Sequence, residues 1–344
     1  MENAVKKLSL AVLAACSVSV ALASDLTVIS FGGANKAAQE KAYYGPFTHA
    51  SGINVVGGEY NGEMAKVKAM VDTHSVSWDV LEVESPELAR GCDEGQFEKL
   101  DYSKLNKADF VPGAVQSCGI GIFVWSTVLA YNGDKFKAGP KSWKDFWDVK
   151  KFPGKRGLRK GAKYTLEIAL MADGVAPKDV YKVLATQAGQ DRAFKMLDRL
   201  KPSIQWWEAG AQPPQYLVSG DVVMSSAYNG RIAASQKDGK NLKIVWNGNM
   251  YDFDSWAIPK GSPNKDAALK FIDFASRPEN QKIYSQNIAY GPSNKKAIAL
   301  LGKKEAADLP TAPQNIKSGV AVDVAFWADY GESLEQRFNA WAAK

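Results

Sequence analysis

Two periods of hydrophobic and polar positions alternate along most of the chain. Short runs rich in β-branched and aromatic residues are separated by segments in which apolar residues recur at helical spacing. The predicted strands are residues 26–31, 53–56, 78–83, 119–131, 204–207, 221–227 and 251–259. The predicted helices are residues 34–48, 64–71, 143–147, 166–172, 191–200, 267–275, 279–286, 296–301 and 324–343. This alternation indicates an α/β protein whose mostly parallel sheets are flanked by helices.

The strand predicted at residues 119–131 is the longest apolar one, and a strand of this length can pass from one domain into another. The strand at 251–259 follows as the return crossing. We therefore expect two lobes joined by hinge strands, with a cleft that closes around a ligand. The first lobe would comprise residues 24–131 and 257–304, and the second residues 132–256 and 305–344.

The return strand carries charged residues that suggest a site. Its period of 2 places Asp252, Asp254 and Trp256 on one face. Two carboxylates beside an indole suit an organic cation, because the acids supply charge and the ring supplies a π face. The alternative is a solvated strand face.

A basic group stands about twenty residues upstream. The strand at 221–227 leads into Tyr228, and Arg231 falls in the first turn of the helical pattern that follows. Ligands of α/β proteins bind at the carboxyl ends of strands, and a helix start with an arginine attracts an anion. An acidic strand and a basic helix start together would hold a zwitterion. The first strand likewise ends at Gly32 and Gly33, which let the backbone approach a ligand closely.

The N-terminal residues are typical of a secretory signal peptide. Lys6 and Lys7 precede sixteen apolar or small residues, and Ala21–Ala23 fits an A-x-A cleavage site. We expect residues 1–23 to be removed and the mature chain to be periplasmic. Cleavage before a lipidated Cys16 is the alternative.

Two cysteines, Cys92 and Cys118, follow the predicted cleavage site. In an oxidising compartment a single pair is most simply a disulfide, which would contribute about 3.5 kcal/mol in the chain-entropy model. Two buried free thiols are the alternative.

Composition and missing motifs exclude several functions. The 344 residues are 46% hydrophobic and 23% charged, with a net charge of +6. Seven basic residues cluster within residues 150–163, which we interpret as a solvated loop rather than a nucleic-acid site. The sequence has two histidines, no G-x-x-x-x-G-K-[ST] loop and no G-x-S-x-G motif. We expect no metal, cofactor, catalytic residue or nucleic-acid partner; a periplasmic hydrolase or lyase is kept as an alternative.

Several motifs together resemble the periplasmic solute-binding proteins of ABC importers of the polyamine (spermidine/putrescine) type. The resemblance spans the mature chain and is carried by Ser30–Gly33, Cys118–Gly121, Trp125–Asn132, Ser142–Asp148, Phe152–Gly157 and Ala257–Pro259. In that family aromatic side chains enclose the alkyl chain of the ligand and acids bind its ammonium ends. The resemblance, with the local patterns above, implies a ligand-binding set of Phe31, Gly32, Gly33, Ser85, Trp125, Tyr164, Tyr228, Arg231, Asp254 and Tyr290.

Two departures from that family change the expected ligand. Arg231 stands where polyamine binders carry a second acid, and Tyr164 aligns with a family glutamate. A guanidinium in a desolvated cleft opposes a dication but offers a bidentate fork to a carboxylate. We therefore expect an ω-amino acid, specifically 4-aminobutyrate, unless Arg231 and Asp254 pair with each other.

The alternative ligand is putrescine or spermidine. Its charge would be met by Asp252, Asp254, Glu84 and Glu208. In either case the resemblance implies a monomeric receptor that delivers its ligand to an inner-membrane ABC permease.

Overall fold

The computed structural model describes residues 25–103 and 105–344. The predicted signal peptide and Cys16 lie outside these residues. The strands of the described residues are β1 (Leu26–Ser30), β2 (Val55–Glu59), β3 (Val80–Glu84), β4 (Val115–Gln116), β5 (Gly119–Asn132), β6 (Arg156–Arg159), β7 (Ile204–Trp207), β8 (Met224–Tyr228), β9 (Leu242–Ala257), β10 (Gly291–Pro292) and β11 (Val320–Ala321).

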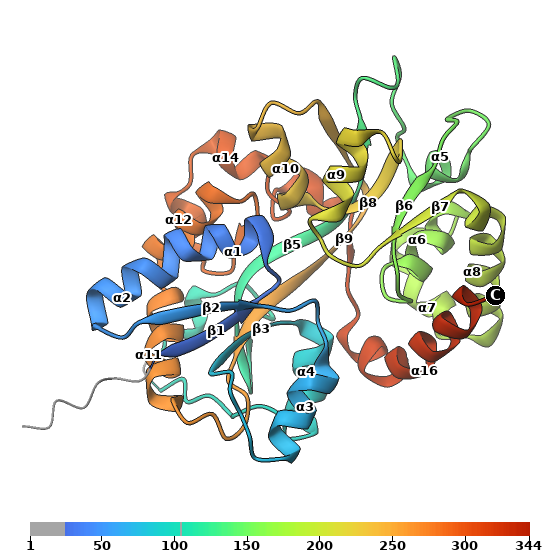
Figure 1. Cartoon of the computed structure of the whole chain (residues 1–344). Helices are drawn as coiled ribbons and strands as arrows, with labels where there is room; N and C mark the ends of the chain where they lie inside the picture. Colours follow the sequence, from blue (N-terminus) through green and yellow to red (C-terminus); the bar gives the residue numbers. More distant parts are fainter. Residues whose placement is uncertain (1–24, 104) are drawn as a thin grey trace, which may run out of the picture.

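Helices pack around the sheet that these strands form (Figure 1). The α-helices of the described residues are α1 (Gly33–Gln39), α2 (Gly45–Ser51), α3 (Met64–Asp72), α4 (Ser85–Asp93), α5 (Trp143–Trp147), α6 (Thr165–Ala172), α7 (Val180–Leu184), α8 (Gln187–Leu200), α9 (Gln212–Ser219), α10 (Asn229–Lys237), α11 (Lys265–Ala275), α12 (Pro278–Asn287), α13 (Lys295–Leu300), α14 (Lys303–Ala307), α15 (Pro313–Lys317) and α16 (Val324–Ala342). A π-helical segment, Glu40–Tyr44, joins α1 to α2. The α/β prediction is confirmed.

Two long strands connect two parallel groups of strands. The main path of the sheet runs β2-β1-β3-β9-β5-β8-β6-β7. The pairs β1–β2, β1–β3, β6–β7 and β6–β8 are parallel, whereas β5 and β9 are antiparallel to each other and to their outer neighbours. We call β1–β3 with α1–α4 the β1 side and β6–β8 with α5–α10 the β6 side. Figure 1 shows β5 and β9 running between them.

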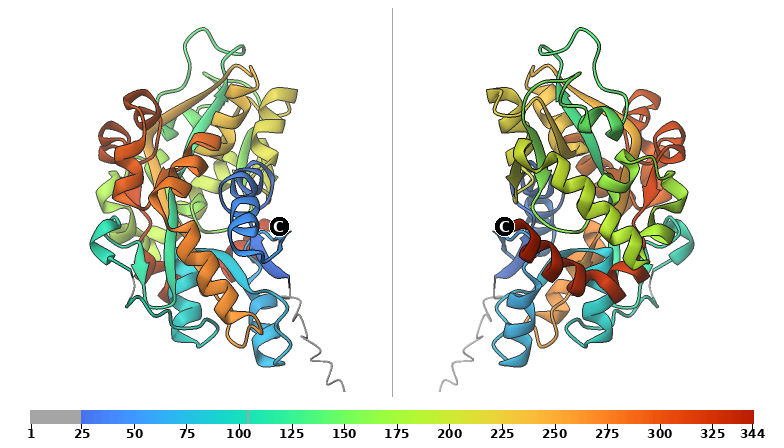
Figure 2. Two further views of the ribbon diagram at one scale, coloured as in Figure 1. Left: turned by 90° about the vertical axis from the view of Figure 1, so that its left-hand side faces the viewer. Right: turned by 90° about the vertical axis from the view of Figure 1, so that its right-hand side faces the viewer.

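The C-terminal helix α16 links the two sides. Its Trp341 donates from Nε1 to Asp198 Oδ1 of α8 at 2.7 Å, and its Glu335 accepts the backbone N–H of Ala162 at 2.9 Å. The same helix packs on α4 of the β1 side. Figure 1 shows it between α4 and α7, and the right-hand view of Figure 2 shows it as the dark red helix that ends at the C-terminus.

The interpretation of residues 150–163 as a solvated loop is wrong for part of that segment. Arg156 is fully buried at the start of β6, where its guanidinium donates to the carbonyl oxygens of Phe146, Gly154 and Phe152. Lys163 is also buried. The three carbonyl oxygens replace the hydrogen bonds to water that the Arg156 guanidinium loses on burial.

The expected disulfide is present. Cys92 at the end of α4 is bonded to Cys118 just before β5, with their Cα atoms 5.7 Å apart. The free-thiol alternative is therefore wrong. Within the described ranges no helix is long and apolar enough to cross a bilayer, and no three His, Cys, Asp or Glu side chains are grouped as a metal site.

Candidate functional site

A small cavity lies where the two sides meet over the long strands. Its walls are formed by Phe31, Asn35, Glu84, Phe123, Trp125, Tyr228, Arg231, Asp254 and Tyr290. Six of these residues were predicted from the sequence, so the structure brings together side chains that are up to 259 positions apart.

Arg231 enters the cavity from the first turn of α10. Its side chain is buried, with 5% of the residue exposed, and Nη2 donates to the carbonyl oxygen of Phe31 at 3.1 Å. The other two nitrogens, Nε and Nη1, are buried without a hydrogen-bond partner among residues 25–103 and 105–344. A buried polar group without a partner is costly, so these two donors favour an acceptor from outside the protein. A carboxylate suits a guanidinium, which binds it bidentately through Nη2 together with either Nε or Nη1.

Glycine at the start of α1 makes room for this guanidinium. Gly33 has φ +56°, and a Cβ atom there would lie 2.7 Å from Arg231 Nη1. Gly230, next to Arg231, gives similar room to the ring of Tyr290, whose Cε1 would lie 2.5 Å from an added Cβ. Gly32, at φ +65°, faces Glu59 and is outside the cavity wall.

Asp254 is an acid of the cavity wall that lies close to Glu82. It is buried on β9, and its Oδ1 accepts a hydrogen bond from Trp125 Nε1 at 2.6 Å. Burial, followed by the nearby Glu82 carboxylate, raises the pKa of Asp254 well above its usual value. No ion pair joins Asp254 to a cation of the described residues, and the possibility that it pairs with Arg231 is wrong. An incoming ammonium group would favour its charged form.

Aromatic rings line the space around these charges. Trp125 packs edge-on against Tyr228 with ring centroids 5.0 Å apart, and Phe123 stacks on Tyr290 at 4.8 Å. Phe31 stacks on Tyr60 at 4.9 Å. The rings exclude water and would contact the methylene groups of a short aliphatic ligand.

The indole beside the acids is a different one from that predicted. Trp256 packs edge-on against Tyr43 and Phe271 in the core of the β1 side. Trp125, from the paired strand β5, takes the place next to Asp254. The alternation along β9 does place the acids and Trp256 on one face, but the cavity touches that face only at Asp254.

A second acid in the wall, Glu84, already has partners. Its Oε2 lies 2.6 Å from Lys163 Nζ and accepts the hydroxyl of Tyr164 at 3.0 Å. Lys163 also pairs with Glu87 at 2.5 Å. Burial would raise the pKa of Glu84, but the charges of Lys163 and Arg159 outweigh it and leave this pKa lowered.

Sequence reasoning missed the buried acid behind Phe31. Glu82 is fully buried and accepts hydrogen bonds from Asn35 Nδ2 at 2.8 and 2.9 Å and from Gln39 Nε2 at 2.8 Å. It also accepts the backbone N–H of Phe31 at 3.2 Å. The available signal was a pair of acids, Glu82 and Glu84, inside the buried strand β3, because buried charges are rare unless they serve a network.

Several proposed site residues lie outside the cavity. Ser85 is buried and donates to the carbonyl oxygen of Phe253 at 3.3 Å, and Tyr164 stands behind Trp125 with ring centroids 5.4 Å apart. Asp252 is buried with a pKa raised to about 7 by burial and by Glu84, but it is not part of the wall. Glu208 is exposed and pairs with Lys160 at 3.0 Å, so its proposed role in binding a polyamine is wrong.

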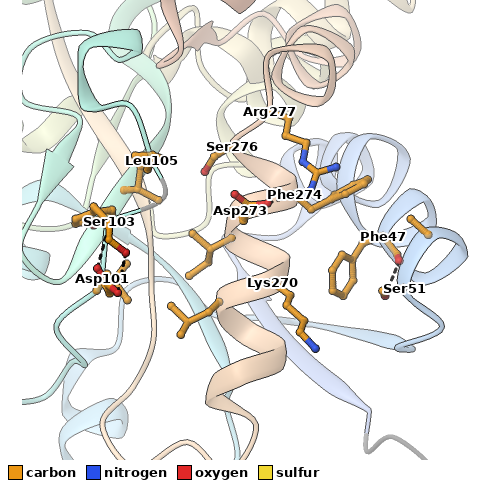
Figure 3. Close-up of a pocket in the computed structure, with 16 residues that line it drawn as sticks. Phe47, Ser51, Asp101, Ser103, Leu105, Lys270, Asp273, Phe274, Ser276 and Arg277 are labelled. Carbon is orange, nitrogen blue, oxygen red and sulfur yellow. Dashed lines mark hydrogen bonds and ion pairs between the residues drawn. The ribbon is translucent and has the colours of Figure 1, made fainter.

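A wider groove on the β1 side lacks these features. Figure 3 shows it between α2, α11 and residues 100–105. Its Arg277 pairs with Asp273 at 3.0 Å, and Ser103 donates to Asp101 at 3.0 Å. Its charged groups lie at the surface, whereas the wall of the smaller cavity holds a buried cation, Arg231, and a buried acid, Asp254.

The fold and the cavity define a class of protein. Two parallel α/β groups joined by two long strands, with a buried binding cavity between them, are the architecture of a two-lobed solute-binding protein. The chain belongs to the family of bacterial extracellular solute-binding proteins, which it matches over residues 40–314. The predicted family is therefore confirmed, and the family places the work of the protein outside the cytoplasm.

Individual relatives refine this assignment. The chain is 62% identical to the gamma-aminobutyric acid-binding protein of Pseudomonas aeruginosa PAO1 over 98% of this chain and 96% of that protein. It is 27% identical to the spermidine/putrescine-binding periplasmic protein of Escherichia coli K12 over 79% and 80% of the two chains. The structure resembles that of the Atu4243 GABA receptor, with a TM-score of 0.83 and 37% identity over 93% of this chain and 98% of that chain. It also resembles the binding protein MotA of A. tumefaciens B6 in complex with glucopine, with a TM-score of 0.89 and 34% identity over 93% and 100%.

Proposed function

We propose that the protein is the periplasmic receptor of an ABC importer for a linear ω-amino acid, with 4-aminobutyrate as the ligand. One observation carries the proposal: Arg231 Nε and Nη1 are buried without partners among the described residues, in the wall of a cavity whose opposite charge is Asp254. The ligand carboxylate would bind the guanidinium, and its ammonium group would bind Asp254. The names of the relatives support this choice of ligand.

Charge balance favours a zwitterion over a diamine. Glu84 is compensated by Lys163, which leaves Arg231 and Asp254 as the groups of the wall without an ion pair, and Asp254 would ionise when an ammonium group binds it. A neutral zwitterion satisfies both. A diamine would satisfy Asp254 and leave a like charge near the buried guanidinium, which is strongly unfavourable in a desolvated site.

We further propose that the two sides are lobes that close on the ligand. The lobes would comprise residues 24–131 with 257–304 and residues 132–256 with 305–344, with β5 and β9 as hinge strands. Arg231 contacts Phe31 across the two sides, and the pair between Lys163 and Glu84 crosses them as well. Ligand contacts from both lobes would stabilise the closed form that a permease recognises. A cleaved signal peptide and a monomeric state complete the proposal.

Calorimetry with four ligands tests the function. The mature protein is titrated with 4-aminobutyrate, 5-aminovalerate, putrescine and spermidine, after a thermal-shift screen in which a ligand at a hundred times its Kd adds ~2.7 kcal/mol. Binding of the amino acids alone supports the proposal. Binding of the diamines alone contradicts it, and recovery of a chemically altered ligand would point to the alternative of a hydrolase or lyase.

The role of Arg231 is tested by Arg231→Ala. Loss of two charge-assisted hydrogen bonds predicts a fall in affinity for 4-aminobutyrate of more than tenfold, which is ~1.4 kcal/mol. Arg231→Lys is the matched control: it keeps the charge but removes the fork, so we expect an intermediate loss. A loss below tenfold in the alanine variant shows that the carboxylate binds elsewhere.

A further inference from the structure

Two acids of the cavity wall are neighbours on paired strands. Glu84 of β3 and Asp254 of β9 lie opposite each other in the antiparallel register, and each residue is 5% exposed. Of these two acids, only Glu84 has an ion-pair partner among the described residues: the ammonium group of Lys163, at 2.6 Å. Two acids thus line the cavity, and Lys163, which is not itself part of the wall, fills the position beside Glu84 with an amine.

The filling amine comes from the other side of the molecule and is held in place. Lys163 precedes α6 on the β6 side, and its side chain is 7% exposed. The backbone N–H groups of Ala162 and Lys163 both donate to Glu335 Oε1 of α16, at 2.9 and 3.3 Å. The next residue, Tyr164, has φ +71°, a conformation that is strained for a bulky residue.

This strained backbone lets consecutive side chains reach one carboxylate. Lys163 Nζ and the Tyr164 hydroxyl both contact Glu84 Oε2. The ammonium group also lies 2.5 Å from Glu87 Oε1. Its surroundings therefore resemble those that a ligand amine would need: two carboxylates and a polar hydroxyl in a buried pocket.

We propose that Lys163 determines specificity by acting as a built-in ammonium group at the Glu84 position, so that the cavity accepts a ligand with one amine. The proposal rests on the proposed function and deepens it, because it assigns the rejection of diamines to a residue other than Arg231. Lys163 neutralises Glu84, which would otherwise attract the second amine of a diamine. Arg231 repels that amine directly, because both carry a positive charge. Specificity of this kind combines missing attraction with added repulsion.

Removing the lysine charge tests the proposal. Lys163→Met keeps the length of the side chain and leaves Glu84 without its cation. We expect the ratio of the Kd for putrescine to the Kd for 4-aminobutyrate, measured by calorimetry, to fall at least tenfold. In Lys163→Met/Glu84→Gln the free carboxylate is also gone, so the ratio should return towards that of the wild type.

Two further variants separate charge from folding. Lys163→Arg keeps a cation and should leave the ratio within threefold of the wild-type value. If Lys163→Met does not fold, Lys163→Met/Glu87→Gln removes one of the carboxylates that the lysine leaves unpaired, retains Glu84, and should show the same tenfold shift.

The outcomes distinguish this proposal from the proposed function. The role of Lys163 is overturned if folded Lys163→Met, or its Glu87→Gln derivative, keeps the Kd ratio within threefold of the wild-type value. This includes the case in which Arg159 takes over the compensation of Glu84. Failure of the wild type to bind 4-aminobutyrate overturns the proposed function instead. A tenfold shift that persists in the Glu84→Gln double variant also overturns the inference, because the gain would not depend on Glu84.

Discussion

Two of the three guanidinium nitrogens of Arg231 are buried without a hydrogen-bond partner in the described parts of the chain. A protein that carried such a group only for stability would lose free energy, since a buried donor without an acceptor costs about 1–3 kcal/mol. This free-energy cost is consistent with a site that binds a ligand oxygen. A bound ligand oxygen would supply the hydrogen bonds that the folded protein does not supply to the guanidinium.

Gly33 permits this arrangement, which a single substitution can test. Gly33→Ala places a methyl group 2.7 Å from Arg231 Nη1 in a left-handed conformation. We expect a stability loss of about 1–2 kcal/mol from backbone strain and a fall in affinity for 4-aminobutyrate of more than tenfold from displacement of the guanidinium. Chemical denaturation and calorimetry measure the two effects.

Gly52→Ala is the matched control. Gly52 also has a left-handed backbone, with φ +75°, but an added Cβ meets nothing within 4 Å. Its strain should be similar while ligand affinity stays unchanged. Equal losses of affinity in both variants would mean that strain, and not the contact with Arg231, weakens binding.

The raised pKa of Asp254 predicts proton release on binding. Burial and the Glu82 carboxylate raise this pKa in the empty site, whereas a bound ammonium group favours the ionised form and lowers it. Affinity should therefore weaken as pH falls through the raised pKa. Calorimetry at slightly acidic pH in two buffers with different ionisation enthalpies should show protons leaving the protein. Proton uptake, or affinity that rises with acid, would exclude Asp254 as the ammonium site.

At the level of single residues, sequence reasoning found the charges but not their full surroundings. Arg231 and Asp254 were visible because a helix start and an acidic strand have local signatures. The sequence could not show which indole, Trp125 or Trp256, lies next to Asp254, because both indoles are buried and both faces of β9 are covered around them. Period alone cannot tell a cavity from a core when neither face meets water.

Helix α16 is tied to the β6 side by a buried acid. Glu167 Oε1 of α6 accepts hydrogen bonds from Trp327 Nε1 of α16 at 2.8 Å and from the hydroxyl of Tyr181 of α7 at 3.1 Å. Its Oε2 is buried without a partner among the described residues. Burial raises the pKa of Glu167 to about 7, so the fold favours the neutral acid.

This pKa makes the stability of the helix junction depend on pH. Because the folded pKa exceeds the unfolded value of 4.5, the stabilisation is complete below pH 4.5 and is lost as pH rises through 7. The unfolding free energy of the wild type, relative to Glu167→Gln, should fall by roughly 3 kcal/mol over this window. Denaturant titrations at pH 4.5, 6 and 8 measure it, with the exposed Glu332→Gln as control. A difference independent of pH would contradict the buried, protonated glutamic acid.

Elements with strong periodicity were predicted well, and mixed ones were not. The helix expected at 166–172 spans Thr165–Ala172, because its run of apolar residues carries its own signal. Strand β9 begins at Leu242 rather than near 251, because Asn247, Gly248 and Asn249 interrupt its apolar residues while pairing with β5 continues on both sides of them. Strand β6 was missed because Arg156 is buried through carbonyl contacts that only the fold supplies.

At the scale of the whole molecule, β5 and β9 form one continuous connection between the two sides. They are paired from Gly119 with Ala257 to Asn132 with Leu242, with irregularities near Phe123 and Leu129. Such breaks in the ladder are places where paired strands bend. The long strand β5 was predictable from its apolar run, whereas the shared sheet was not, because pairing between distant strands leaves no local pattern.

Closure of the lobes predicts a change in size. Addition of 4-aminobutyrate should lower the radius of gyration measured by small-angle scattering, because the ligand would join Arg231 and Asp254 of one proposed lobe to the rings of Phe31, Trp125 and Tyr290 in the other. Arg231→Ala should keep the larger radius at the ligand concentration that saturates the wild type. An unchanged radius in the wild type would mean that the lobes do not move on binding.

The orientation of the bound ligand tests the central claim most directly. We expect a crystal structure of the complex with 4-aminobutyrate to show its carboxylate hydrogen-bonded to the Arg231 guanidinium and its ammonium group on Asp254. A ligand bound in the reverse sense, or outside the cavity between β5, β8 and β9, would contradict the zwitterion clamp.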